Sequence, residues 1–180
     1  VVVVENLEPN ILQVVVPPEV GEGQVFPLTI IAQDPGGDPM RFALDLDGDG
    51  VFEQAQAGDP TFFVSYGNNG FYTLETQVCD DQDACQTKTA TVSVGNLPPT
   101  IDAVQVTSPI QEGGTAEFRV EATDVASDQA QLSYGFDFDN DGDFADDLVQ
   151  ASPITSFRFQ RAGTYSVGIR VSDSDGGVST

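Results

Sequence analysis

The sequence predicts an all-β protein made of two tandem β-sandwich domains. Short segments with alternating apolar and polar residues recur at roughly ten-residue spacing, separated by turns rich in Gly, Asp and Pro. No segment of ten or more residues has the periodicity of an amphipathic helix. The sequence Asn-Leu-x-Pro occurs at residue 6 and again at residue 96, which is 90 positions later (96 − 6). This internal repetition indicates two domains of about 90 residues, residues 6–95 and 96–180.

The predicted strands occur in the same order in both halves. In each strand, alternate apolar residues place one face of the sheet toward a core. The paired segments are residues 26–33 and 116–123, 42–46 and 134–138, 61–66 and 155–159, and 70–78 and 163–171. Tyr72 and Tyr165 are expected to face inward, whereas Phe71 and one of Phe62 and Phe63 are left as candidate exposed aromatics.

An acidic motif, Asp-x-Asp-x-Asp-Gly, follows the second of these strands in each half. Three carboxylates on alternate residues converge on a hard cation only if the backbone curls around it, and a Gly at the sixth position permits that curl. Oxygen ligands suit calcium better than magnesium or zinc, and the sequence contains no His. The predicted Ca2+ ligands are Asp45, Asp47, Asp49, the Val51 carbonyl and Glu53 in the first loop, and Asp137, Asp139, Asp141, Asp143 and Asp146 in the second.

The alternative interpretation of these loops is that they are solvated turns. Two copies in register, each at the end of an apolar strand, favour the cation site. The first loop is the stronger prediction, because its ninth position is Glu53, whereas the ninth position of the second loop is Ala145.

The composition restricts the partners. The chain has 29 acidic and 6 basic residues and a net charge of −23, which argues against nucleic acid and anionic membrane surfaces. No stretch approaches the roughly 20 apolar residues of a membrane span, so no membrane insertion is expected. Divalent cations, a saline medium and basic partners remain open explanations of the charge.

The two cysteines, Cys79 and Cys85, flank a five-residue turn that is poor in Gly. Metal binding by two Cys without His is disfavoured, and a redox role usually needs Cys-x-x-Cys. A structural disulfide across this hairpin is therefore predicted, which places the protein in an oxidising location, extracellular or at the cell surface.

Several motifs resemble the PKD repeat, an immunoglobulin-like module of polycystins and of many bacterial and archaeal surface proteins. They are Asn6-x-x-Pro9, Asp34 before Gly36-Gly37-Asp38, the strand that ends in Asp45, and Gly70-x-Tyr72-x-Leu74. The resemblance covers both halves and implies tandem immunoglobulin-like sandwiches. It also implies that Tyr72 and Tyr165 occupy a tyrosine-corner position with a structural hydroxyl bond.

The sequence departs from the PKD pattern in two ways. The usual core Trp is Leu44 in one half and Phe136 in the other, a substitution with little functional consequence. The usual Asp-Phe-Gly-Asp-Gly turn is lengthened to Asp-x-Asp-x-Asp-Gly, and this lengthening favours cation binding here.

Catalysis is not predicted. Nucleophile–His arrangements are excluded without His, and neither a Gly-x-Ser-x-Gly sequence nor a phosphate loop occurs. The favoured function is a calcium-binding structural repeat of an extracellular fibre, adhesin stalk or surface array. The alternative is an accessory module of a secreted hydrolase that binds polysaccharide or a surface protein.

The final expectation concerns residues 1–5, Val1, Val2, Val3, Val4 and Glu5. Val2 and Val4 precede Asn6-Leu7 as Val92 and Val94 precede Asn96-Leu97. Residues 1–5 are therefore predicted to be the closing strand of a neighbouring domain, and the second domain is predicted to lack its own last strand. Identical units would then join head to tail by strand addition into a filament.

Overall fold

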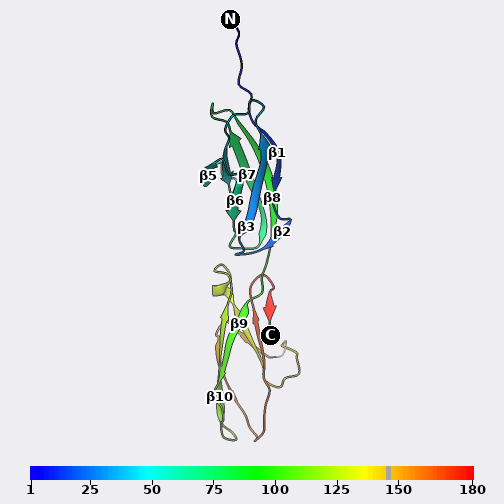
Figure 1. Cartoon of the computed structure of the whole chain (residues 1–180). Coiled ribbons are helices and arrows are strands. Elements are labelled where there is room, and N and C mark those ends of the chain that lie inside the picture. The colour runs from blue at the N-terminus through cyan, green and yellow to red at the C-terminus, as the bar shows by residue number, and fades with distance from the viewer. Residues whose placement is uncertain (145–146) are drawn as a thin grey trace. The chain divides into compact units, whose positions relative to one another are not determined.

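The computed structural model describes residues 1–144 and 147–180, which form two compact units, residues 1–95 and 96–180 (Figure 1). Both units consist of β-strands, and helical structure among the described residues is limited to one 3-10 turn, Gln129–Gln131. The predicted fold class is therefore confirmed. Among the described residues, no helix is long and apolar enough to cross a membrane.

The first unit packs a three-stranded sheet, in the order β1-β3-β6, against a five-stranded sheet, in the order β2-β8-β7-β4-β5. Its strands are β1 (Asn10–Val15), β2 (Glu19–Gly21), β3 (Phe26–Gln33), β4 (Arg41–Asp45), β5 (Gln54–Ala57), β6 (Thr61–Val64), β7 (Gly70–Cys79) and β8 (Cys85–Gly95). The inward faces form one core of Ile11, Phe26, Leu28, Ile30, Phe42, Leu44, Phe62, Val64, Leu74, Val78, Val92 and Val94. The period-two pattern of the sequence fixes which face of each strand is buried.

The second unit has a three-stranded sheet, in the order β9-β10-β13, and a four-stranded sheet, in the order β12-β11-β14-β15. Its strands are β9 (Thr100–Val106), β10 (Thr115–Thr123), β11 (Ser133–Asp137), β12 (Leu148–Gln150), β13 (Ile154–Arg158), β14 (Gly168–Ser172) and β15 (Val178–Ser179). Aromatic rings dominate its core, which contains Ala116, Phe118, Val120, Leu132, Tyr134, Phe136, Phe159 and Val171.

The prediction of a continuous strand over residues 163–171 is wrong, because β14 begins at Gly168. Gly168 pairs with Asp137, the last residue of β11, so residues 163–167 extend beyond that strand. In the first unit the corresponding part of β7 pairs with β8, whereas no described strand pairs with residues 163–167. Tyr165, predicted to face inward, is consequently 47% exposed.

The predicted tyrosine hydroxyl bonds are present in both units. Tyr72 donates its hydroxyl hydrogen to the Asn68 carbonyl at 2.9 Å, and Tyr165 donates to the Arg161 carbonyl at 3.0 Å. Each bond spans four residues and fixes the loop that leads into the tyrosine strand.

The structure contains the predicted disulfide between Cys79 and Cys85. The two residues are paired opposite each other at the tip of the β7–β8 hairpin, with their Cα atoms 4.1 Å apart. The covalent bond closes a hairpin whose tip requires a positive φ of 65° at Asp83, a non-glycine residue.

Residues Val1–Val4 are exposed by 78% or more and form no strand, and Figure 1 shows them extending away from the sheets of the first unit. Their predicted role as a closing strand for a neighbouring domain stays a prediction.

Replacing both cysteines with serine should lower the free energy of unfolding of the first unit by about 2 kcal/mol, because a short cross-linked loop restricts the unfolded chain by that order. Denaturant titration of the Cys79→Ser/Cys85→Ser variant measures this loss. Serine already stands at Ser172, the position that corresponds to Cys79, so the second unit is an internal control whose transition should not move. Equal stability of variant and parent would contradict a structural role for the disulfide.

Candidate metal centre

The first acidic loop starts where β4 ends, at Asp45, a fully buried residue. The Asp45 carboxylate accepts hydrogen bonds from the backbone N–H groups of Asp47 at 3.2 Å, Gly48 at 2.6 Å and Gly50 at 2.9 Å. Gly48 and Gly50 have φ values of 76° and 88°, in the left-handed region that glycine enters at low cost. The strand end, the carboxylate and the two glycines together produce the curl that the motif predicts.

This curl brings four of the predicted ligands together. Asp45, Asp47, Asp49 and Glu53 each offer a carboxylate oxygen, and these oxygens lie within 4.8 Å of one another. Glu53 reaches back across the loop and accepts a hydrogen bond from the Leu46 N–H at 2.8 Å. Four converging carboxylates match the oxygen-rich coordination of calcium. The fifth predicted ligand, the Val51 carbonyl, belongs to the same loop.

The second loop repeats this geometry with fewer carboxylates. Asp137, Asp139 and Asp141 form the corresponding group within 4.8 Å, and Asp137 accepts a hydrogen bond from the Gly142 N–H at 2.9 Å. Asp143 does not belong to this group, and the predicted ligand Asp146 lies outside the described residues.

Hydrogen bonds and neighbouring carboxylates shift the pKa values of the loop aspartates in opposite directions. Burial opposes ionisation of Asp45, but the hydrogen bonds from Gly50, Gly48 and Asp47 outweigh it and lower the pKa of this carboxyl. Asp137 has a pKa that is lowered in the same way, by Gly142 and Asn140 against burial. The neighbouring carboxylate of Asp141, by contrast, raises the pKa of Asp139. A divalent cation would relieve this repulsion.

A ring in the second loop, Phe144, anchors that loop to the outer face of the sheet. Phe144 lies against Gly135 and Gly168, and a Cβ added at Gly135 would be 2.9 Å from the ring. The Arg170 guanidinium lies 4.5 Å from the ring centroid on the same face. This anchor was not predicted from the sequence, although glycine inside a strand is a signal of close approach.

Tyr66 also supports the first loop, and this role was not predicted from the sequence. Its hydroxyl donates to the Leu46 carbonyl at 2.9 Å, and its ring stacks on Tyr72 with centroids 3.8 Å apart. Burial, followed by Tyr72 and the loop carboxylates, raises the pKa of Tyr66 to about 12. The hydroxyl therefore stays protonated and remains a donor at neutral pH.

The exposed aromatics of the first unit do not form one platform. Phe63 and Phe71 are 68% and 85% exposed, while Phe62 is buried at 3%. Phe63 lies on β6 and Phe71 on β7, which belong to different sheets.

Comparison with known families gives a match for the second unit. Residues 96–180 match the family model described as PKD domain. This similarity of the second unit to PKD domains supports a structural or binding module. None of the curated proteins compared with the chain matches it.

Solved structures of β-sandwich modules are similar to the chain at low identity. The PKD domain of an M14-like peptidase from a Thermoplasmatales archaeon is 24% identical, covers 50% of this chain and 98% of its own, and has a TM-score of 0.43. A structure of carbohydrate-binding modules from the β-sandwich superfamily is 17% identical over 97% of this chain and 95% of its own, with a TM-score of 0.45. Fibronectin(III)-like modules of Clostridium thermocellum CbhA are 14% identical over 96% and 89%, with a TM-score of 0.41. These values are too low to carry an argument about function.

Replacing Asp45 with asparagine should lower the melting temperature of the first unit by on the order of 5 °C, because one acceptor oxygen becomes a donor that opposes a backbone N–H. The lowered pKa of Asp45 adds a stabilisation that is present above the ordinary aspartate pKa of about 4 and is lost as the pH falls below it. The variant should therefore lose less stability than the parent between about pH 4 and pH 2. Thermal melts across this range in EDTA measure both effects, with the exposed Glu8→Gln as control. Parallel pH curves for Asp45→Asn and the parent would contradict the assigned role.

Proposed function

We propose that the chain is a non-catalytic, calcium-binding structural unit of an extracellular fibre, stalk or surface array. The observation that carries this proposal is the convergence of Asp45, Asp47, Asp49 and Glu53 on one curled loop at the end of β4. Calcium bound there would tie the end of β4 to the residue that precedes β5, and the same ion at the second loop would hold the end of β11. A stiffened sandwich is the property that a load-bearing repeat requires.

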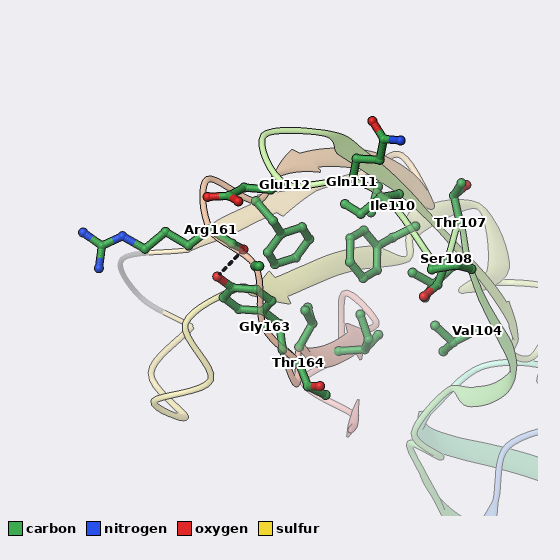
Figure 2. A pocket seen from close by; sticks show the side chains of 18 residues that line it. Val104, Thr107, Ser108, Ile110, Gln111, Glu112, Arg161, Gly163 and Thr164 are labelled. Carbon is green, nitrogen blue, oxygen red and sulfur yellow. Dashed lines mark hydrogen bonds between the residues drawn. The ribbon is translucent and has the colours of Figure 1, made fainter.

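The proposal includes a way for units to join. In the first unit, the end of β8 lies between β2 and β7, because residues 93–95 pair with β2 and residues 90–94 pair with β7. In the corresponding segments of the second unit, residues 109–111, residues 163–165 and Val167 line a groove of about 610 Å³ (Figure 2). Figure 2 shows Ile110 beside the aromatic rings of this groove, while the guanidinium of Arg161 points away from it. An extended strand with apolar residues on one face fits such a groove.

We assign this groove to residues 1–5 of a second copy of the chain. Val2 and Val4 hold the same place before Asn6-Leu7 that Val92 and Val94 hold before Asn96-Leu97. All four valines at residues 1–4 are exposed and available for pairing. Val92 and Val94 are 0% and 4% exposed in β8, so Val2 and Val4 would be buried in the groove in the same way.

A second candidate function, binding of polysaccharide by an accessory module, is favoured by a neighbouring cleft of about 590 Å³ in the second unit. Phe138, Phe157 and Tyr165 line it together with Arg158 and Arg161. Phe138 and Phe157 stack with centroids 4.1 Å apart, and stacked rings beside arginines suit sugar rings and their hydroxyls. Retention of the chain on chitin or cellulose that is lost in Tyr165→Ala would favour this function over the array.

Calcium should raise the melting temperature of the protein. If the loops bind with the affinity of extracellular modules, millimolar calcium stabilises each loaded unit by about 1–3 kcal/mol through mass action. Melts in EDTA and in about 10 mM calcium measure the shift. Asp47→Ala should remove more of it than Asp139→Ala, because the first loop has the additional ligand Glu53. Superimposable melting curves with and without calcium would refute the calcium proposal.

Changing Val2 and Val4 to aspartate should prevent self-association of the chain, because two charges would enter an apolar groove. The matched variant Val1→Asp/Val3→Asp changes the charge equally but places it on the opposite face of the strand, so it should still associate. Analytical ultracentrifugation over a concentration series measures both. A parent chain that stays monomeric at high concentration, or equal association of the two variants, would contradict strand addition.

A further inference from the structure

Tyr66, in the segment between β6 and β7, is attached to the first acidic loop by one hydrogen bond. Its hydroxyl donates to the Leu46 carbonyl at 2.9 Å. In the sequence, Leu46 lies between Asp45 and Asp47, two of the four residues whose carboxylate oxygens converge in this loop. Because Asp45 is the last residue of β4, this hydrogen bond holds the backbone at the point where the loop begins to curl.

Tyr66 is itself held by contacts with the rest of the first unit. Its carbonyl accepts a hydrogen bond from the N–H of Gly23, in the turn between β2 and β3, at 2.7 Å. Its ring stacks on the Tyr72 ring with centroids 3.8 Å apart, and its centroid lies 6.3 Å from that of Phe26, a buried core residue. The ring of Tyr66 is therefore fixed by core contacts, and its hydroxyl joins the acidic loop to the core of the sandwich.

The peptide groups of Leu46 receive two supports of different kinds. The Leu46 N–H donates to the Glu53 carboxylate at 2.8 Å, and the Leu46 carbonyl accepts from Tyr66. Glu53 is a candidate ligand, so its carboxylate would serve the cation and the Leu46 N–H together. The Tyr66 hydroxyl uses no oxygen of the ligand group, so its hydrogen bond is compatible with a bound cation.

The second unit has a phenyl ring at the corresponding position. Tyr72 and Tyr165 correspond, at an offset of 93 residues (165 − 72), because each donates its hydroxyl to the carbonyl of the residue four positions earlier. At the same offset, the position of Tyr66 is occupied by Phe159 (159 − 66 = 93). The Phe159 ring is buried and packs against Tyr165 with centroids 4.6 Å apart. The ring contact is thus kept in both units, whereas the hydroxyl is present only in the first.

This comparison separates two roles of Tyr66. Its ring packs in the core, and Phe159 performs this role in the second unit without a hydroxyl. The hydroxyl of Tyr66 adds the hydrogen bond to Leu46. Its loss should therefore act on the acidic loop and leave the core packing intact.

We propose that Tyr66 is a positioning residue of the first acidic loop, which holds the four converging carboxylates in the binding arrangement before a cation arrives. This inference rests on the calcium site proposed for this loop. A loop that is already curled spends less of the binding free energy on ordering its backbone, so its apparent affinity rises with the fraction of molecules in the competent form. The first loop then binds calcium more tightly than the second for two reasons, an additional carboxylate and a tethered backbone.

Removal of the hydroxyl alone tests this role. In Tyr66→Phe, the ring should keep its core contacts, as Phe159 does in the second unit, while the loop loses its tether to the core. The calcium concentration that half-saturates the first loop should rise about fivefold, the factor that corresponds to one hydrogen bond of ordinary strength.

Two backbone N–H groups report the loops separately in an NMR titration of the full chain with calcium. The Gly50 N–H donates to Asp45 in the first loop, and the Gly142 N–H donates to Asp137 in the second. The midpoint of the Gly50 titration should rise in Tyr66→Phe, whereas the midpoint at Gly142 should equal that of the parent. The second loop is therefore a control within the same molecule.

The matched control variant is Tyr72→Phe. It removes a hydroxyl from the other ring of the same stack, one that donates to the Asn68 carbonyl and not to the acidic loop. Both variants lose one phenol hydroxyl, but only Tyr66→Phe should raise the Gly50 midpoint. In EDTA, hydrogen exchange at the Gly50 N–H should also be faster in Tyr66→Phe than in Tyr72→Phe, which gives a readout that needs no calcium.

The outcomes separate this inference from the calcium proposal. Equal Gly50 midpoints in Tyr66→Phe and the parent would overturn the positioning role and leave the calcium site in place. A rise of equal size in Tyr66→Phe and Tyr72→Phe would also overturn it, because a general loss of stability would then explain the effect. A Gly50 resonance that does not respond to calcium in the parent would refute the calcium site, and this inference with it.

Discussion

The acidic loops depend on one interaction, a buried aspartate that closes a β-strand by accepting backbone hydrogen bonds. Asp45 ends β4 with no exposed surface, and its two oxygens take N–H groups from the loop that follows. The carboxylate is a better acceptor in its ionised form, which is why the pKa of Asp45 is lowered despite burial. Once this residue fixes the backbone, the side chains of the alternating acidic residues beyond it face the same centre.

The second unit has the same strand-closing aspartate, but different residues support its loop. Asp137 closes β11 in the same way, but its loop is held from outside by Phe144, whose ring lies against Gly135 and Gly168. In the first unit the corresponding support comes from Glu53 within the loop, whose carboxylate accepts a hydrogen bond from the Leu46 N–H. In the first loop, the additional carboxylate of Glu53 both holds the backbone and is a candidate ligand. In the second loop, the Phe144 ring holds the backbone, and the group has one carboxylate fewer.

Local features of the structure were predictable from the sequence, because each depends on residues close together in the chain. The curl at Gly50 and the disulfide of Cys79 and Cys85 follow from short-range patterns, and the hydroxyl bond of Tyr72 was implied by the resemblance to the PKD repeat. Residues 163–167 were mistaken for a strand because their apolar alternation is correct but they lack a partner, and pairing is not visible in a local pattern. The exposure of Phe63 beside buried Phe62 was left open for the same kind of reason, since it depends on the register of β6 against β3.

The group formed by Asp34, Asp38 and Asp80 could not be predicted from the sequence for a different reason. Its members come from two turns separated by four strands, so only the topology of the sandwich brings them together. Asn6 and Asn96, noticed in the sequence only as repeat markers, prove to be hydrogen-bond donors to Asp80 and Asp173. The repeated asparagines therefore have a structural role that their spacing in the sequence alone did not reveal.

The most direct measurement of the central claim is the anomalous scattering of crystals grown with calcium, or with terbium as its heavier substitute. The account predicts a peak enclosed by Asp45, Asp47, Asp49 and Glu53, with metal–oxygen distances of about 2.3–2.6 Å. Well-ordered loops in such crystals with water or a lysine ammonium at that centre, and no anomalous signal, would contradict it.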